Sequence, residues 1–236
     1  MTATRHLIVN ADDFGQSPGI NRGVIEAHER GIVTSASLMV RWPAAESAAA
    51  YARAHPTLTV GIHADLGEWV FRKETWVPVY EVVPRNDRKR LAGEISRQLG
   101  EFRRLVGRQP THIDSHQHVH RQEPVRSILL RMARHLGVPL RSYSRVVRYC
   151  GDFYGQTAQG SPLPELISVE NLIAILTALP GGFTELGCHP GLADDLNTMY
   201  RTERTEEVSV LCDARVRTAI ASLRVQLCSF SAVAHP

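Results

Sequence analysis

The stretch HLIVNADDFG, residues 6–15, begins with a short apolar run and ends in two adjacent aspartates before a glycine. Residues 6–10 have the length and composition of a buried β-strand. The next segment, residues 19–30, has its hydrophobic residues at the spacing of an amphipathic helix. A strand followed by a helix is the repeating unit of parallel sheets. The first thirty residues therefore predict a β/α unit with carboxylates at the end of its strand.

The same alternation continues along the chain. Further apolar runs predict strands at residues 34–40, 58–62, 111–115, 138–142, 184–188 and 226–230. Helical periodicity is found between them, at residues 43–54, 88–106, 124–135, 168–179 and 213–223, and several of the helical segments have a Ser, Asp or Pro at the start. Seven strands alternating with helices predict an α/β fold with a closed or nearly closed parallel (β/α) barrel, and an open doubly wound sheet is the alternative.

Length and composition predict one domain. A chain of 236 residues with 43% hydrophobic content can bury a single core, so we expect one domain over residues 1–236. Two stretches, residues 67–87 and 146–165, show neither the hydrophobic period of a strand nor that of a helix. We expect them to be long loops beside a binding site.

Charge and cysteine usage exclude several classes of partner. The formal charge of +3 arises from 27 basic and 24 acidic residues without a basic tract, so we expect no nucleic-acid partner. No apolar run approaches the roughly 18 residues that cross a bilayer, so we expect no membrane insertion. The four cysteines are far apart, and no signal segment precedes Leu7. These features predict a cytoplasmic protein with free thiols.

Polar side chains follow the predicted strands at the point where each strand ends. Asp12 and Asp13 follow the first strand, and His63 follows the third. Later strands end at Asp114, His116, Arg141 and His189. In a β/α barrel the carboxyl ends of the strands meet at one mouth, where active sites are built. Each residue alone has an ordinary structural explanation, such as a helix cap, but together they predict one site.

The stretch THIDSHQHVH, residues 111–120, strengthens this interpretation. Alternate positions carry His112, Asp114, His116, His118 and His120. Alternate side chains of a strand point to one face, so these polar groups point together while the segment stays extended. The pattern favours a metal site, and a polar strand end with solvated histidines is the alternative.

The residue types indicate hydrolysis with a metal ion. One carboxylate and two imidazoles form a triad suited to Zn(II) or another divalent ion, with a coordination position left for water. A second carboxylate can then act as general base, and a histidine can protonate the leaving group. Successive residues of a strand point in opposite directions, so Asp12 and Asp13 are expected to divide the roles of base and ligand. Their spacing does not determine which takes which role.

Several motifs together resemble one family. VNADDFGQSPGINRGVIEAHERGIVTSASLMV, GIHADL, PTHIDSHQHVH, DFYGQ and ELGCHPG resemble segments of the YdjC-like carbohydrate deacetylases, and the resemblance extends from about Leu7 to Phe230. The resemblance implies an irregular seven-stranded (β/α) barrel that removes the N-acetyl group of an amino sugar with one divalent metal ion. The ligand types favour Zn for this ion, and Mg is the alternative.

Individual roles come from the same resemblance. It implies that Asp13, His63 and His116 are the metal ligands. By similarity to the wider polysaccharide deacetylases, Asp12 is expected to be the general base and His189 the general acid.

Other residues are expected to assist. Arg141 is expected to orient Asp12, because a guanidinium fixes a carboxylate and keeps its pKa low. We expect Asp114, His118, Trp69 and Tyr154 to bind substrate.

The expected substrate is an N-acetylated amino sugar, in an oligosaccharide or glycoside. A metal-dependent phosphoesterase and a sugar-binding protein without catalysis are the alternatives. The sequence leaves the oligomeric state open, with a homodimer as one candidate.

Overall fold

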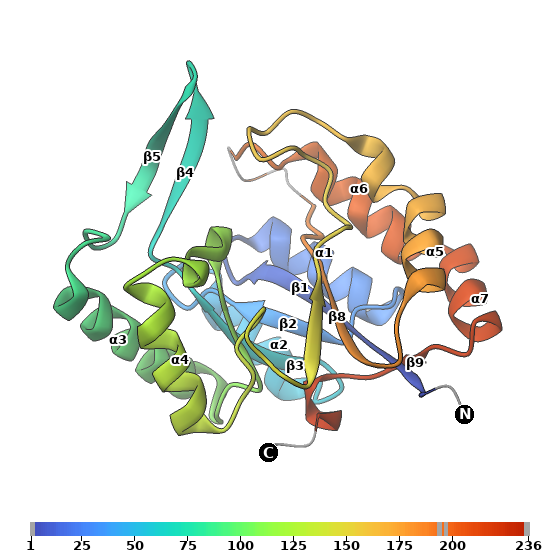
Figure 1. Ribbon diagram of the computed structural model, residues 1–236, viewed down its shortest axis with the longest axis horizontal. Coiled ribbons are helices and arrows are strands. Elements are labelled where there is room, and N and C mark those ends of the chain that lie inside the picture. The colour runs from blue at the N-terminus through green and yellow to red at the C-terminus, as the bar shows by residue number, and fades with distance from the viewer. Residues whose placement is uncertain (1–2, 193–194, 196–197, 234–236) are drawn as a thin grey trace.

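The computed structural model describes residues 3–192, 195 and 198–233 (Figure 1). Its strands are β1 (Arg5–Phe14), β2 (Ser35–Leu38), β3 (Thr59–Ala64), β4 (Gly67–Arg72), β5 (Thr75–Glu81), β6 (Ile113–Ser115), β7 (Val147–Cys150), β8 (Gly182–Cys188) and β9 (Gln226–Leu227). Its α-helices are α1 (Pro18–Glu29), α2 (Ala45–Ala54), α3 (Arg88–Val106), α4 (Val125–Leu136), α5 (Val169–Ala178), α6 (Thr202–Leu211) and α7 (Ala214–Ser222). Short 3-10 helices span His116–Arg121, Pro164–Ile167 and Phe230–Ala232.

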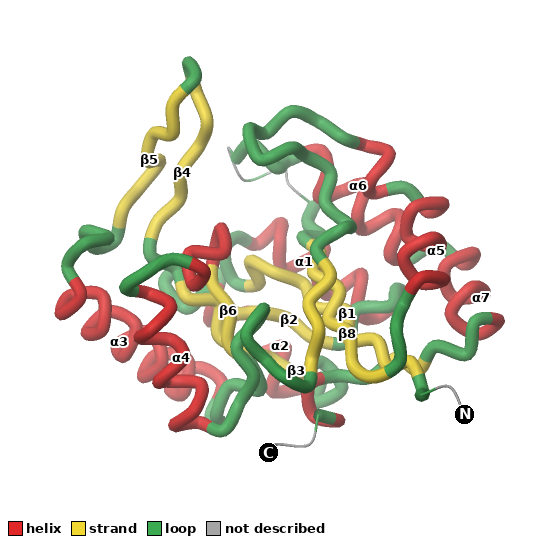
Figure 2. Tube along the Cα trace, in the orientation of Figure 1, coloured by secondary structure: helices red, strands yellow, loops and turns green. Residues whose placement is uncertain are grey.

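Seven parallel strands form one curled sheet. Their order is β6-β3-β2-β1-β8-β7, and β9 pairs with the start of β1. Helices lie around the outside of this sheet (Figure 2). Within the described residues, β6 and β7 end the order and do not pair with each other, so the sheet stays open on one side. The expected α/β fold with an irregular seven-stranded parallel barrel is confirmed.

Residues 138–142 were predicted to form a strand, and this prediction was wrong. This segment forms only one bridge, between Leu140 and Ile113. Pro139 has no N–H to donate to a neighbouring strand, and Ser142 has a φ of 66°, which turns the chain away. The open edge of the sheet is formed instead by β7, which lies in a stretch predicted to be a loop.

Two further elements differ from the prediction. Residues 67–81, expected to be irregular, form the antiparallel hairpin β4–β5, whose turn places Lys73 and Glu74 at positive φ. Helix α6 was not predicted, because Glu203, Arg204 and Glu207 occupy buried positions that an amphipathic pattern would give to apolar residues. The last predicted strand is reduced to the two residues of β9.

Local sequence explains the starts of several helices. Ser17, Asp87, Ser168 and Asp213 each accept a hydrogen bond from a backbone N–H in the first turn of α1, α3, α5 and α7. Such caps satisfy donors that the helix itself leaves free. The expected Ser and Asp helix starts are therefore confirmed.

Side chains inside the curled sheet become more polar toward its mouth. Ile8 and Phe230 belong to a small apolar cluster at one end. Asn10 and Ser37 form a hydrogen bond of 2.8 Å in the next layer, and Asn10 also donates to Asp12 at 3.0 Å. Residues 8, 10 and 12 follow one another at the two-residue period of a strand. The strand period of β1 thus brings Asp12 to the mouth.

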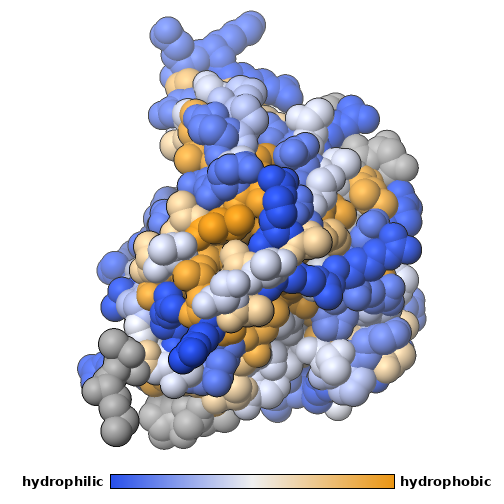
Figure 3. All heavy atoms as spheres, turned by 90° about the vertical axis from the view of Figure 1, so that its right-hand side faces the viewer, coloured by the Kyte–Doolittle hydropathy of each residue, from blue (hydrophilic) through white to orange (hydrophobic). Residues whose placement is uncertain are grey.

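The face of the molecule on the side of α5 and α7 is mixed in polarity (Figure 3). On this face, hydrophobic residues form an interrupted band between polar ones (Figure 3). Among the described residues, no helix is both long and apolar enough to cross a membrane. All four cysteines are free, as the sequence predicted.

Candidate functional site

A cavity of about 840 Å³ lies at the carboxyl ends of the strands. Eight of the ten predicted site residues line it: Asp12, Asp13, His63, Trp69, His116, His118, Tyr154 and His189. The other two, Asp114 and Arg141, are buried behind this lining. The tertiary structure therefore brings together residues that are up to 177 positions apart in the sequence.

The backbone of β1 changes direction at the two aspartates. The pairing with β2 shifts register between Ala11 and Phe14, and Asp13 has a φ of 64°. This left-handed conformation is uncommon outside glycine, although aspartate tolerates it better than most residues. The two carboxylates consequently do not point to opposite faces, as they would on a regular strand. Both line the cavity, and each contacts a different arginine.

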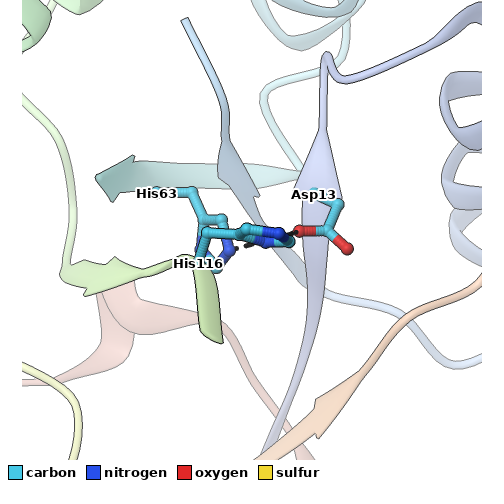
Figure 4. A group of neighbouring side chains, drawn as sticks. All are labelled: Asp13, His63 and His116. Carbon is cyan, nitrogen blue, oxygen red and sulfur yellow. Dashed lines mark hydrogen bonds and ion pairs between the residues drawn. The ribbon is translucent and has the colours of Figure 1, made fainter. Parts of the chain in front are cut away.

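Asp13, His63 and His116 form a candidate metal site (Figure 4). Asp13 Oδ1 lies 3.3 Å from His63 Nε2 and 2.9 Å from His116 Nδ1, and the three side chains point toward one another. One oxygen and two nitrogen donors suit Zn(II) or another divalent ion. The Nε2 atom of His116 is buried without a hydrogen-bond partner. The donor set and the spacing therefore fit one divalent ion.

A second group, Asp12, His63 and Asp114, has similar spacing. Arg141 lies within 2.7 Å of both Asp12 and Asp114, so a fixed positive charge already occupies this group. Arg141 occupies both oxygens of Asp12, whereas Arg204 contacts only Oδ2 of Asp13 and leaves Oδ1 facing the two imidazoles. The group containing Asp13 is the better metal site.

Protonation of the candidate ligands follows from their mutual contacts. Burial opposes ionisation of Asp13, but His116 and Arg204 outweigh it and hold its pKa well below the ordinary value. Burial also disfavours protonated imidazoles, yet the Asp13 carboxylate raises the pKa of His116 to about 9. Asp114 and Asp12 raise the pKa of His63 in the same way. A metal ion would thus replace protons on these rings, which couples binding to proton release.

Asp114 holds His63 from behind. Its Oδ1 lies 2.7 Å from His63 Nδ1, so the other ring nitrogen is directed at Asp13. Ser37 donates a hydrogen bond of 2.6 Å to the second Asp114 oxygen. Carboxylates in this position fix the orientation of a metal-binding imidazole. Asp114 was expected to bind substrate, but its fully buried side chain is outside the cavity lining and contacts a candidate ligand instead.

Arg141 clamps Asp12, as the sequence predicted. Its two terminal nitrogens lie 2.5 and 2.7 Å from the two Asp12 oxygens. It also contacts Asp114 at 2.7 Å and donates from Nε to Glu185 at 2.8 Å. Burial works against the charge of Asp12, but Arg141 lowers its pKa below the ordinary value. Burial raises the pKa of Glu185 to about 7. Of the three carboxyl groups that contact Arg141, Glu185 is therefore the one that carries a proton in acidic solution.

His189 faces Asp12 across the cavity, with its Nε2 3.7 Å from Asp12 Oδ2. The rings of Tyr154 and Tyr200 pack edge-on against it at 5.2 and 5.5 Å. Its backbone N–H donates to Glu207 of α6. Burial lowers the pKa of its imidazole to about 4, so the resting ring is neutral at neutral pH.

Helix α6 also contributes to the site, and its sequence does not predict this role. Arg204 donates a hydrogen bond of 2.6 Å to Asp13 Oδ2 and another of 3.2 Å to the backbone carbonyl of His189. Tyr200 donates from its hydroxyl to Glu207. The α6 sequence TERTEEVSVL resembles that of an exposed polar helix. Only the burial of Glu203, Arg204 and Glu207 reveals a role at the site.

Comparisons with known proteins agree with this geometry. The family model of YdjC-like proteins matches residues 6–222. A carbohydrate deacetylase of Geobacillus stearothermophilus is 34% identical over 96% of this chain and 97% of its own length. A chitooligosaccharide deacetylase of Klebsiella pneumoniae (strain 342) is 32% identical over 92% of this chain and 94% of its own length. A solved protein from Enterococcus faecalis V583 superposes with a TM-score of 0.77 at 26% identity, covering 98% of this chain and all of that one.

Proposed function

The chain belongs to the YdjC-like family, and we propose that it is a metal-dependent carbohydrate deacetylase that removes the N-acetyl group of an amino sugar. The observation that carries this proposal is the triad of Asp13, His63 and His116 on the cavity wall, with Asp12 beside it. The activity in the names of the Geobacillus and Klebsiella relatives supports the same reaction.

A divalent ion held by Asp13, His63 and His116 would activate water and polarise the amide carbonyl. Two imidazoles and one carboxylate favour Zn(II), and Mg(II) is the alternative. In this proposal Arg204 keeps the second oxygen of Asp13 occupied, so the carboxylate offers the ion a single oxygen. The cavity beside the triad leaves space for water and the acetyl group.

Asp12 is the general base in this mechanism. Both of its oxygens are fixed by Arg141, and Oδ1 also accepts a hydrogen bond from Asn10. These contacts keep the carboxylate ionised and aimed at the cavity, where it can take a proton from the attacking water. Asp114 and Glu185 hold Arg141 in turn.

His189 is the general acid. Its resting imidazole is neutral, so it must be protonated during the reaction before it can supply the sugar nitrogen with a proton. The Asp12 carboxylate, 3.7 Å away, is placed to stabilise that imidazolium. Tyr154 and Tyr200 enclose the ring and limit its contact with water.

We assign the substrate contacts to cavity residues that are not candidate metal ligands. Trp69 of β4 and Tyr154 of the segment after β7 both line the cavity. These two segments stand apart from each other in the fold (Figure 1). His118 points its Nε2 toward the Tyr149 hydroxyl at 3.4 Å, and its Nδ1 is buried without a partner. That free nitrogen can hydrogen-bond a sugar hydroxyl.

The test measures acetate released from N-acetylglucosamine oligomers, before and after chelation and after addition of Zn(II) or Mg(II). We expect metal-dependent acetate release, with no phosphate released from simple phosphate monoesters. Phosphate release in place of acetate would support the phosphoesterase alternative. Tight oligomer binding without release of either product would support the non-catalytic one.

A further inference from the structure

The hairpin β4–β5 forms one wall of the cavity. It stands apart from the rest of the chain on one side, and the segment after β7 lies on the other side (Figure 1). Hairpin residues Trp69, Val70 and Trp76 line the cavity, together with Arg85 just beyond the hairpin. The cavity therefore continues outward from the candidate metal site along this wall.

The base of the hairpin is firmly anchored. Asp65, fully buried just before β4, accepts hydrogen bonds from Arg41 at 2.9 Å, Trp42 at 3.1 Å and the Tyr80 hydroxyl of β5 at 2.9 Å. The N–H of Gly67 also donates to it, at 3.2 Å. A carboxylate with four donors holds both strands at their inner ends. The wall thus keeps a fixed position beside the cavity.

A second anchor joins the hairpin to the metal site. The Gln117 side chain accepts from the Trp69 N–H at 2.9 Å and donates to the Trp69 carbonyl at 2.8 Å. Gln117 directly follows the candidate ligand His116 in the chain. The inner part of the wall is therefore fixed relative to the reacting centre, as pre-organised binding requires.

The two tryptophans of the wall differ in their surroundings. Trp69 packs partly against the main core, and the Arg85 guanidinium lies 3.4 Å over its ring. Trp76 is 50% exposed and contacts Phe71 edge-on at 5.5 Å. It belongs to neither core cluster, although it lines the cavity. Packing explains Trp69 but leaves the exposed face of Trp76 unexplained.

We propose that Trp76 forms a subsite for a further pyranose ring of the substrate, outward from the acetylated residue. This inference rests on the proposed deacetylase function. The apolar face of a pyranose can stack on an indole while its hydroxyls reach water or polar neighbours. A volume of about 840 Å³ is within the usual range for ligand sites and leaves room for more than one ring. The substrate class is accordingly an oligosaccharide or a glycoside, in preference to a free monosaccharide.

The test compares kinetics on N-acetylglucosamine and its oligomers up to the pentamer, with the metal-loaded protein. Trp76→Ala should raise KM for the oligomers about 3- to 10-fold, in line with the usual contribution of an aromatic contact. Its kcat, its metal content and its activity on the monomer should not change. Trp76→Phe should restore most of the loss. Val79→Ala is the matched control, because Val79 is 54% exposed on the same strand but outside the cavity lining.

Equal KM values for wild type and Trp76→Ala across all lengths would overturn the subsite while acetate release still upheld the deacetylase function. If no acetate is released, binding of the pentamer is measured by titration calorimetry. Weaker binding to Trp76→Ala than to wild type would then support a sugar subsite on a protein of different activity. Equal binding, or none to either protein, would overturn it.

Discussion

The floor of the cavity and the hairpin β4–β5 hold their side chains in different ways. The floor, taken together with the charged side chains directly behind it, consists of Asp12, Asp13, Asp114, Arg141 and Arg204, none more than 3% exposed. Each floor residue has at least two charged or hydrogen-bonding partners. The hairpin is anchored at its base, but Trp76 and Val79 are at least half exposed.

This difference has an energetic consequence. Removing one member of a buried charged network leaves its partner without compensation, which is costly. Removing an exposed hairpin side chain costs only its contact with substrate. We therefore expect floor substitutions to abolish or redirect chemistry and hairpin substitutions to tune binding.

Replacing either candidate histidine ligand should have the largest effect. His63→Ala and His116→Ala each remove one of three donors, and no neighbouring imidazole can replace it. We expect almost complete loss of both bound metal and turnover, checked by elemental analysis and acetate release. His118→Ala is the control and should keep its metal. A full equivalent of metal in either ligand variant would refute the site as assigned.

Replacing Asp12 and replacing Asp13 should have different effects on metal binding and on rate. Asp12→Asn should keep metal and lose rate by roughly two to four orders of magnitude, the usual range for a positioned general base. Asp13→Asn should weaken metal binding itself. Metal titration of both variants beside their rates provides the check. Equal metal loss in both would mean that the two carboxylates share the ion.

Asp114→Asn tests the carboxylate that orients the candidate metal ligand His63. The charge that orients His63 is lost, so metal affinity should fall by roughly 10- to 100-fold, as for other partners of metal-binding histidines. KM at saturating metal should stay unchanged, because Asp114 does not line the cavity. Asp152→Asn, at a cavity-lining carboxylate without a ligand contact, is the control. A raised KM with unchanged metal affinity would restore the substrate role expected from the sequence.

Glu185 should make stability depend on pH. Its pKa rises from 4.5 to about 7 on folding, chiefly because of burial, so between these values the folded state holds a proton that the unfolded chain has released. The free energy of unfolding should then decrease as pH rises through this window, by at most about 1.4 kcal/mol per pH unit. Glu185→Gln should flatten this slope in denaturant titrations, and the exposed Glu165→Gln should not. An unchanged slope in Glu185→Gln would contradict the raised pKa.

Loosening the hairpin should have the smallest effect. Gln117→Asn introduces a residue that tolerates the backbone φ of 50° at this position. The shorter Asn side chain cannot make both hydrogen bonds to the Trp69 backbone. Two hydrogen bonds of about 1 kcal/mol each support the inner wall, so we expect KM for oligomers to rise about 2- to 10-fold. Metal content and kcat should stay as in wild type. A large loss of metal would show that the hairpin and the floor act as one unit.

Much of the fold could be predicted because its signals are local. Apolar runs gave the positions of β1, β2, β3, β6 and β8, and Ser, Asp or Pro residues marked the starts of several helices. The hairpin and β7 were missed because their strands are short, partly exposed and lack a regular alternation. Strands of this kind are fixed by pairing with a neighbour more than by their own sequence.

The residues that could form the site were recognisable from the sequence alone. Asp12, Asp13, His63 and His116 stand at strand ends, and strand ends of a parallel barrel meet at one mouth whatever the loops do. The Arg141 contact with Asp12 could be predicted for the same reason, since a guanidinium at a neighbouring strand end has carboxylates within reach.

The arrangement of those residues around the cavity, in contrast, depends on the tertiary structure. The left-handed turn at Asp13, the placement of Asp114 behind His63, and the approach of Arg204 from α6 all depend on contacts between segments distant in sequence. A buried arginine on a helix has the same local sequence pattern as an exposed one. Its role is set by the carboxylate that packing brings beside it, because burial makes a charge depend on its partner.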